Sequence, residues 1–212
     1  MVSKTYLERL GITPWCYKNK IETITAKPSV EQSLQSLRET VATCTACALH
    51  ETRTQTVFGV GNEQAKLMII GEAPGFYEDQ RGEPFVGRAG QLLTAMLNAI
   101  HLTREEVYIA NILKCRPPNN RDPQVNEVST CTPYLHQQIT WIKPKLLLAV
   151  GRIAAHHLLQ TKLSLERLRN TVHAYVPTGT PLFVTYHPAY LLRSPVDKNK
   201  AYSDLRFIQT LL

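Results

Sequence analysis

Four of the five cysteines are spaced like ligands of a metal ion or of an inorganic cluster. Cys44 and Cys47 form a C-x-x-C pair, and Cys115 and Cys131 follow with fifteen residues between them. Four thiolates in this pattern suit tetrahedral zinc or an iron–sulfur cluster, and the spacing does not decide between these. The alternative is four unconnected buried thiols, since free cysteine packs as a small hydrophobic side chain. Cys16 stands apart and is interpreted as a non-ligand.

Three polar residues stand within or directly after apolar segments of the chain. Glu72 follows one segment, Asn111 interrupts another, and His187 follows a third. A carboxamide buried in an apolar strand is costly without hydrogen-bond partners, so Asn111 has either a structural partner or a ligand. Histidine suits stabilisation of a developing anion, although a lone histidine is more often structural.

Half of the ten glycines lie in one stretch, residues 71–93, with the sequence GEAPGFYEDQRGEPFVGRAGQLL. Glycine lets a ligand or another chain approach the backbone closely. Phe85 stands between glycine turns and outside any expected helix or strand, which favours a pocket over the core. Gly87 and Gly90 open a helix whose N-terminus suits a phosphate.

Apolar runs alternate with helical patterns in the elements that must position these residues. Alternating strands and helices are typical of a parallel sheet covered on both faces, where ligands bind outside the carboxyl ends of the strands. Glu72, Asn111 and His187 are therefore predicted to meet. Strands are expected at 66–70, 107–113, 145–150 and 181–186, and helices at 30–43, 88–100, 125–142, 151–160 and 197–212. Residues 1–30 are predicted to be an N-terminal appendage and linker, and residues 31–212 the main domain.

The composition bounds the class of protein. Of 212 residues, 43% are hydrophobic, which is enough for a buried core, and the formal net charge of +7 favours a polyanionic partner such as nucleic acid. No apolar run reaches the roughly 18 residues of a membrane span. The N-terminus has no apolar segment of signal-peptide type, so a cytoplasmic location is expected.

Four motifs resemble the family 4 uracil-DNA glycosylases, the iron–sulfur branch of that superfamily. GEAPGFYED, GEPFVGRAGQLL, NILKCRPPNNRDP and HPAYLLR occur in the family's order, and the resemblance covers residues 36–212. It implies a three-layer α/β/α fold around a four-stranded parallel sheet, and a DNA repair enzyme that flips uracil out and hydrolyses its N-glycosidic bond. It also implies a [4Fe-4S] cluster on the four spaced cysteines, and a monomer.

The resemblance assigns the catalytic and uracil-binding residues. It implies that Phe85 stacks on the base, that Asn111 pairs with O4 and N3–H of uracil, and that His187 donates to O2 as the uracil anion forms. Cytosine presents a different pattern of donors and acceptors at the edge that Asn111 would contact.

The loop before the stacking ring completes the expected uracil site. Gly71 brings backbone N–H groups close to uracil and the flanking phosphate. Ala73 stands where the best-known branch of the superfamily has an aspartate, and alanine cannot act as a base. Glu72 and Glu78 are assigned to the site without a firm role as the base, and Glu78 is a candidate to exclude the methyl group of thymine.

The DNA contacts are expected at the rim of the same site. A leucine wedge is predicted to fill the gap that the flipped base leaves, and arginines to contact phosphates. These residues are Arg88, Arg116, Leu191, Leu192 and Arg193, with Arg81, Arg121 and Arg152 as further phosphate contacts.

Other interpretations stay open beside the glycosylase. One is an inactive iron–sulfur module of the same fold that binds DNA without releasing a base, and another is a structural protein that binds zinc. Separately, YLERLGITPW resembles the start of the psi accessory subunit of bacterial clamp loaders, and this implies the chi subunit as a partner of residues 1–15.

Overall fold

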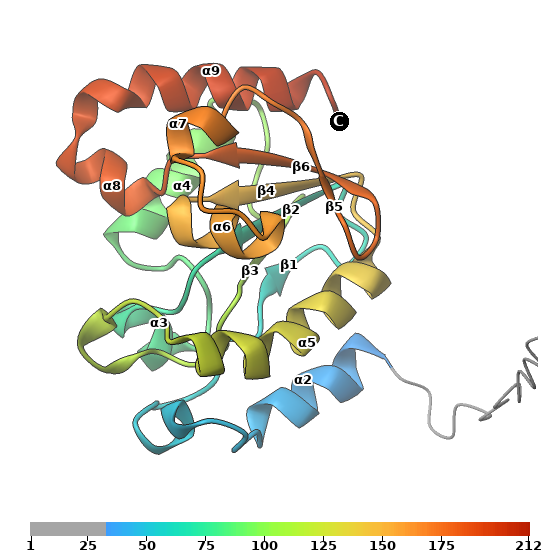
Figure 1. Ribbon diagram of the computed structural model, residues 1–212, viewed down its shortest axis with the longest axis vertical. Helices are drawn as coiled ribbons and strands as arrows, with labels where there is room; N and C mark the ends of the chain where they lie inside the picture. The colour runs from blue at the N-terminus through green and yellow to red at the C-terminus, as the bar shows by residue number, and fades with distance from the viewer. Residues whose placement is uncertain (1–32) are drawn as a thin grey trace, which may run out of the picture. The chain divides into compact units, whose positions relative to one another are not determined.

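The computed structural model describes residues 33–212, all within the unit Gln32–Leu212 (Figure 1). The predicted appendage 1–30, Cys16 and the predicted chi-binding residues 1–15 lie outside the described residues. Within the described part, no helix is long and apolar enough to cross a membrane.

The sheet has six strands in the order β1-β3-β2-β4-β6-β5. The four inner strands are parallel, which confirms the predicted four-stranded parallel sheet. Two short antiparallel strands, β1 and β5, extend it at the edges and were not predicted, because neither forms an apolar run. The bounds are β1 Val60–Gly61, β2 Leu67–Gly71, β3 Tyr108–Asn111, β4 Leu146–Val150, β5 His173–Tyr175 and β6 Thr180–Thr185.

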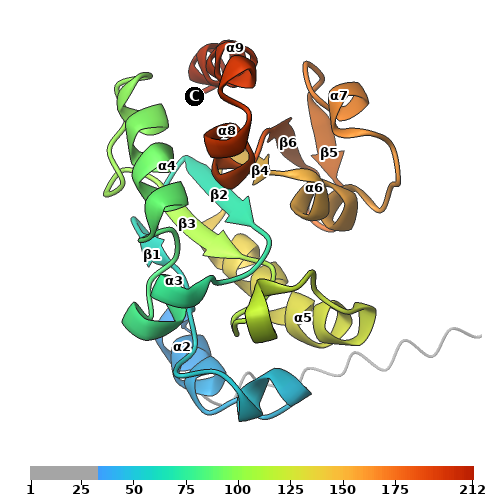
Figure 2. The same cartoon turned by 90° about the vertical axis from the view of Figure 1, so that its left-hand side faces the viewer.

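Helices cover both faces of the sheet (Figures 1 and 2). Side chains alternate along each strand, so Met68 and Ile70 pack with α2, α5 and α6, whereas Leu67 and Ile69 pack with α4, α8 and α9. Two cores on one sheet make the predicted three-layer fold. The helices are α2 Leu34–Ala42, α3 Phe76–Arg81, α4 Arg88–Asn98, α5 Val125–Ile142, α6 Arg152–Leu159, α7 Leu165–Leu168, α8 Pro188–Arg193 and α9 Lys198–Gln209, with 3₁₀ turns at Ala48–Glu51, Pro118–Asn120 and Pro195–Asp197.

The strand order places a crevice at the carboxyl edge of the sheet. From β2 the chain passes to β3 on one side, whereas β4 and β6 lie on the other side. Ligands of such sheets bind where the order reverses, outside the carboxyl ends of the strands. Gly71 and Asn111 are paired neighbours at these ends of β2 and β3, and His187 follows the end of β6.

Candidate functional site

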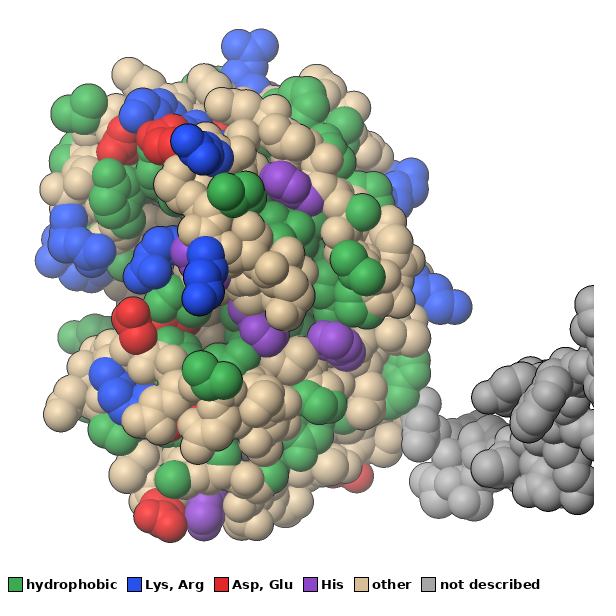
Figure 3. All heavy atoms as spheres, viewed as in Figure 1, with side chains coloured by type: hydrophobic (Ala, Val, Ile, Leu, Met, Phe, Trp, Pro, Cys, Tyr) green, Lys and Arg blue, Asp and Glu red, His purple; other side chains and the backbone are tan. Residues whose placement is uncertain are grey.

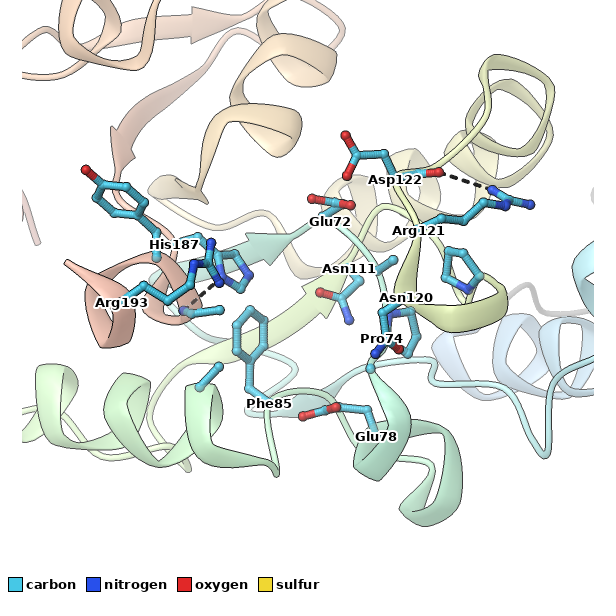
Figure 4. A pocket seen from close by; sticks show the side chains of 16 residues that line it. Glu72, Pro74, Glu78, Phe85, Asn111, Asn120, Arg121, Asp122, His187 and Arg193 are labelled. Carbon is cyan, nitrogen blue, oxygen red and sulfur yellow. Dashed lines mark hydrogen bonds between the residues drawn. The ribbon is translucent and has the colours of Figure 1, made fainter.

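A cavity of about 490 Å³ opens at this edge of the sheet. Its wall includes Phe85, Asn111 and His187, which come from distant parts of the chain and lie around one space (Figure 4). Glu72, Ala73 and Glu78 line the same cavity. The structure therefore brings together the side chains that the strand-end rule predicted to meet.

The Phe85 loop is held in an unusual conformation by several contacts. Phe85 has a φ of +55°, and its ring lies 5.7 Å from that of His187, centroid to centroid. Its carbonyl oxygen accepts a hydrogen bond from Arg104 at 3.2 Å. Glu78 Oε1 accepts the backbone N–H groups of the next two residues, each at 2.9 Å. A non-glycine residue at positive φ persists only where its surroundings enforce it, so these contacts fix the ring at the cavity wall.

Gly90→Ala is expected to displace this loop. A Cβ at position 90 would stand 1.7 Å from the carbonyl oxygen of Phe85, and backbone on both sides prevents relief. Because displacement of a positioned group by about 1 Å can cost on the order of 10²-fold in rate, the variant should lose most base-release activity. Single-turnover assays check this. Gly179→Ala is the control, since φ there is +70° but no atom lies within 4 Å of the added carbon; equal activity in the two variants would contradict the steric argument.

Asn111 is the last residue of β3, and its side chain has an unused hydrogen-bond acceptor. The residue is 2% exposed, and Oδ1 has no hydrogen-bond partner within the described residues. A Cβ at Gly71 would stand 2.4 Å from this oxygen and 2.7 Å from the Phe85 ring, so the glycine leaves room for both side chains. An unpaired buried acceptor costs about 1–3 kcal/mol. Its place at the cavity wall indicates a ligand that donates a hydrogen bond.

His187 is the N-cap residue of α8. Its Nδ1 accepts the backbone N–H of Ala189 at 3.1 Å, which leaves the proton of a neutral ring on Nε2. Burial, followed by the positive charge of Arg193, lowers the pKa of His187 to about 4, against a smaller opposing effect of Glu78. The ring is therefore a neutral N–H donor at ordinary pH. A Cβ at Gly151 would stand 2.8 Å from the His187 Cβ, so that glycine allows the imidazole its place.

Glu72 lines the cavity with a carboxyl group that titrates near neutrality. Burial, followed by the negative charge of Asp122, raises its pKa to about 7, and Arg152 opposes this shift. A group with a pKa near the working pH can accept a proton in one step and donate it in another. Among the predicted carboxylates of the site, Glu72 is thus the one suited to proton transfer, because Glu78 is occupied by two backbone N–H groups.

The raised pKa of Glu72 predicts a specific dependence of stability on pH. The folded state holds this proton up to about pH 7, whereas the unfolded chain releases it near the ordinary value of 4.5. The contribution of Glu72 to the free energy of unfolding is therefore full below pH 4.5 and is lost as pH rises through 7. Urea unfolding at several pH values should show Glu72→Gln gaining stability relative to wild type across this window. A constant difference between the two proteins would contradict it.

Further residues of the cavity were not predicted as site residues. Asn120, Asp122 and Tyr190 line it, together with Arg121, which was predicted only as a phosphate contact. Arg121 forms a two-point ion pair with Glu127, with N–O distances of 2.9 and 2.6 Å, so its guanidinium is already engaged. For Asn120, Arg121 and Asp122 the available signal was the polar, proline-rich stretch PPNNRDP after β3.

The predicted DNA contacts fall into two groups. Arg193 lines the cavity and Leu192 is 37% exposed, so both can meet a DNA strand. Leu191 is not exposed as a wedge would be: its side chain is 1% exposed and packs in the core. Arg88 is exposed at the start of α4, and Arg116 lies over the ring of Phe76, 5.1 Å from its centroid. Lys and Arg side chains border one side of a hollow in the surface, and acidic side chains lie at its other side (Figure 3).

The four spaced cysteines line a second, small cavity. All are free thiols: Cys44, Cys47, Cys115 and Cys131. Three of the sulfur atoms accept hydrogen bonds, from Arg53 at 3.1 Å, from the hydroxyl of Tyr134 at 3.3 Å and from the backbone N–H of Lys114 at 3.2 Å. Donors directed at sulfur are typical of thiolate ligands. Within residues 33–212, no three His, Cys, Asp or Glu side chains are grouped closely enough to hold a metal ion.

Known proteins match most of the chain. Residues 58–206 match the family model of the uracil DNA glycosylase superfamily. The type-4 uracil-DNA glycosylase of Archaeoglobus fulgidus is 43% identical over 186 residues, which cover 85% of this chain and 94% of that protein. The enzyme of the same name from Thermotoga maritima is 42% identical over 77% of this chain and 85% of its own length. A type-5 uracil-DNA glycosylase of Thermus thermophilus is 28% identical over 61% of this chain and 67% of that protein.

Proposed function

The chain belongs to the uracil-DNA glycosylase superfamily, and on this premise we propose that it excises uracil from DNA in base excision repair. It is a hydrolase acting on an N-glycosidic bond, and its product is an abasic site. The inactive DNA-binding module is not favoured, since relatives named as type-4 enzymes align with most of the chain.

The observation that carries this proposal is the unused acceptor of Asn111 in the cavity that Phe85 and His187 also line. A base must leave the duplex to reach such a cavity, and a flipped uracil offers an N3–H donor beside the O4 acceptor. Oδ1 would accept the N3–H, and the amide nitrogen would donate to O4. Cytosine has neither that donor nor that acceptor, so the same side chain rejects it.

The reaction breaks the bond between N1 of uracil and C1′ of the sugar. The bonding electrons stay on uracil, which leaves as an anion, and the Nε2–H of His187 stabilises the charge at O2. Water adds to C1′ and loses one proton. With alanine at position 73, we assign Glu72 as the acceptor of that proton. The surroundings are already polar and oriented, so little rearrangement is needed as charge develops.

The direct test uses an oligonucleotide with a single uracil, incubated with the protein and then treated with alkali. Strand cleavage at the uracil position is expected, with none at cytosine or thymine in the same context. Retained binding to the uracil strand without cleavage, in protein with its full iron content, would support the inactive module instead.

We further propose that the four cysteines hold a [4Fe-4S] cluster. A zinc ion requires four sulfurs within about 2.3 Å of one point, whereas a cluster needs thiolates spread around a larger group. Four cysteine side chains around one site, three with hydrogen-bond donors on sulfur, are the donor set that such a cluster would need. Because Lys114 and Cys115 line this cavity, a cluster there would organise the loop that carries Arg116 and would take no part in electron transfer in the reaction.

Cys131→Ser is expected to remove most of the bound iron and the visible absorbance that distinguishes an iron–sulfur cluster from zinc. The melting temperature should fall as well, because metal binding to the folded state contributes folding free energy. Iron analysis, absorbance and thermal unfolding check these outcomes. A colourless wild-type protein with stoichiometric zinc would contradict the assignment of the cluster.

The remaining partner and location are proposals that rest on the sequence. We propose chi as a partner of residues 1–15, tested by a pull-down in which deletion of residues 1–30 should abolish capture; unchanged capture would end the idea. A cytoplasmic location and a monomeric state remain predictions, which fractionation and light scattering would check.

A further inference from the structure

Lys114 is a fully buried lysine in the short segment between Asn111 and Cys115. Its side chain is 1% exposed, and burial of an ammonium group is costly unless hydrogen bonds and opposite charge compensate for it. Within residues 33–212, no aspartate or glutamate forms an ion pair with it. Other contacts must therefore compensate for the cost of burying the ammonium group of Lys114.

The ammonium group of Lys114 directly contacts β3, the strand that ends at Asn111. Nζ donates to the backbone carbonyl of Asn111 at 2.8 Å and to the side chain of Gln138 at 2.6 Å. Strand β1 pairs with β3 only at Tyr108 and Ile109, so it is this side chain, and not the paired part of β1, that bonds to the Asn111 carbonyl. On the other side, Asn111 is paired with Gly71 of β2.

The same lysine faces the cysteine cavity. It lines that cavity, and its own backbone N–H donates to the sulfur of Cys131 at 3.2 Å. Cys115 and Cys131 line the same cavity as Lys114. Ligand thiolates would therefore supply the negative charge that a buried lysine lacks elsewhere in the described chain.

We propose that Lys114 is a positioning residue that couples the cysteine site to uracil recognition. The ligated thiolates balance its charge, and its ammonium group holds the Asn111 carbonyl so that the carboxamide faces the uracil cavity. This inference rests on the proposed function. It gives the cysteine site a part in base recognition although that site lies outside the cavity.

A double-mutant cycle separates this role from general support of the fold. Lys114→Met keeps most of the side-chain length and removes the charge and both hydrogen bonds. If Lys114 acts through the Asn111 carboxamide, Lys114→Met should lower kcat/KM for uracil release by about 10- to 100-fold in wild type and by less than about 3-fold in an Asn111→Ala background. Affinity for free uracil, measured by calorimetry, should fall in the first background and stay unchanged in the second. Lys145→Met is the exposed-lysine control and should match wild type.

Each other outcome of the cycle is decisive. Equal losses in both backgrounds would overturn the inference, and so would loss of iron in Lys114→Met, which would make the lysine a support of the cysteine site alone. If Lys114→Met does not fold, Lys114→Arg serves the same cycle, because it keeps the charge and shifts the hydrogen bond. The loss in kcat/KM caused by Lys114→Arg should be smaller, and it should again appear only in protein that retains Asn111. If the wild-type protein releases no uracil, the result contradicts the proposed function itself.

Discussion

His187→Ala is expected to lower kcat for uracil release by about 10²–10³-fold, equivalent to roughly 2.7–4 kcal/mol of transition-state stabilisation. The reason lies in where charge develops: the N–H of a neutral ring meets the uracil oxygen only as the bond to the sugar breaks. Substrate binding depends less on this contact, so KM should change much less than kcat. Single-turnover rates with a uracil-containing oligonucleotide measure the effect.

His187→Gln is the matched variant for this experiment, since its side-chain amide can still donate a hydrogen bond. Part of the lost rate should return with glutamine. The wild-type rate should also show no decline from protonation of His187 until the pH approaches its pKa of about 4. A loss that appears wholly in KM would refute the role as a neutral donor. So would a fall in rate near the ordinary histidine pKa that persists in Glu72→Gln, since Glu72 itself titrates near pH 7.

Asn111→Ala is expected to combine a large loss of activity with little loss of stability. Two hydrogen bonds to the uracil edge disappear, and at about 1.5 kcal/mol each kcat/KM should fall by roughly 10²-fold. In the free protein the buried Oδ1 has no partner in the described chain, so its removal takes away a desolvation cost. The unfolding free energy should therefore stay within about 1 kcal/mol of wild type or rise.

Chemical denaturation and kinetics on the same preparation test both parts of this expectation. A strongly destabilised Asn111→Ala protein would show that the amide is a satisfied structural group. Leu113→Ala, in the same segment and fully buried, is the comparison: it should lose several kcal/mol of stability through the cavity that it leaves.

Much of this architecture could be predicted from local sequence pattern. The inner strands are short apolar runs because both of their faces are buried, and α5 spans the predicted residues 125–142. That Asn111 and His187 lie close together could also be predicted, because both stand at the carboxyl ends of strands and parallel strands end at one edge of the sheet.

What escaped prediction depends on contacts between residues far apart in sequence. The positive φ of Phe85 follows from Arg104 and Glu78, and nothing within the Phe85 segment itself requires that conformation. Leu191 and Leu192 read alike in sequence, yet the turn of α8 buries one and exposes the other. The link from Lys114 to Asn111 is local in sequence, but only the folded chain shows that this lysine points inward.

The N-cap of α8 joins the residue proposed to stabilise the leaving base to the residues expected to contact DNA. The hydrogen bond that starts this helix also selects the imidazole tautomer of His187, while the helix carries Leu192 and Arg193 toward the DNA. The bond joins the N-cap residue to the second residue of the helix, so it depends only on the local fold of α8. The ring is therefore set as an N–H donor before DNA binds, and the same short helix that fixes it carries Leu192 and Arg193.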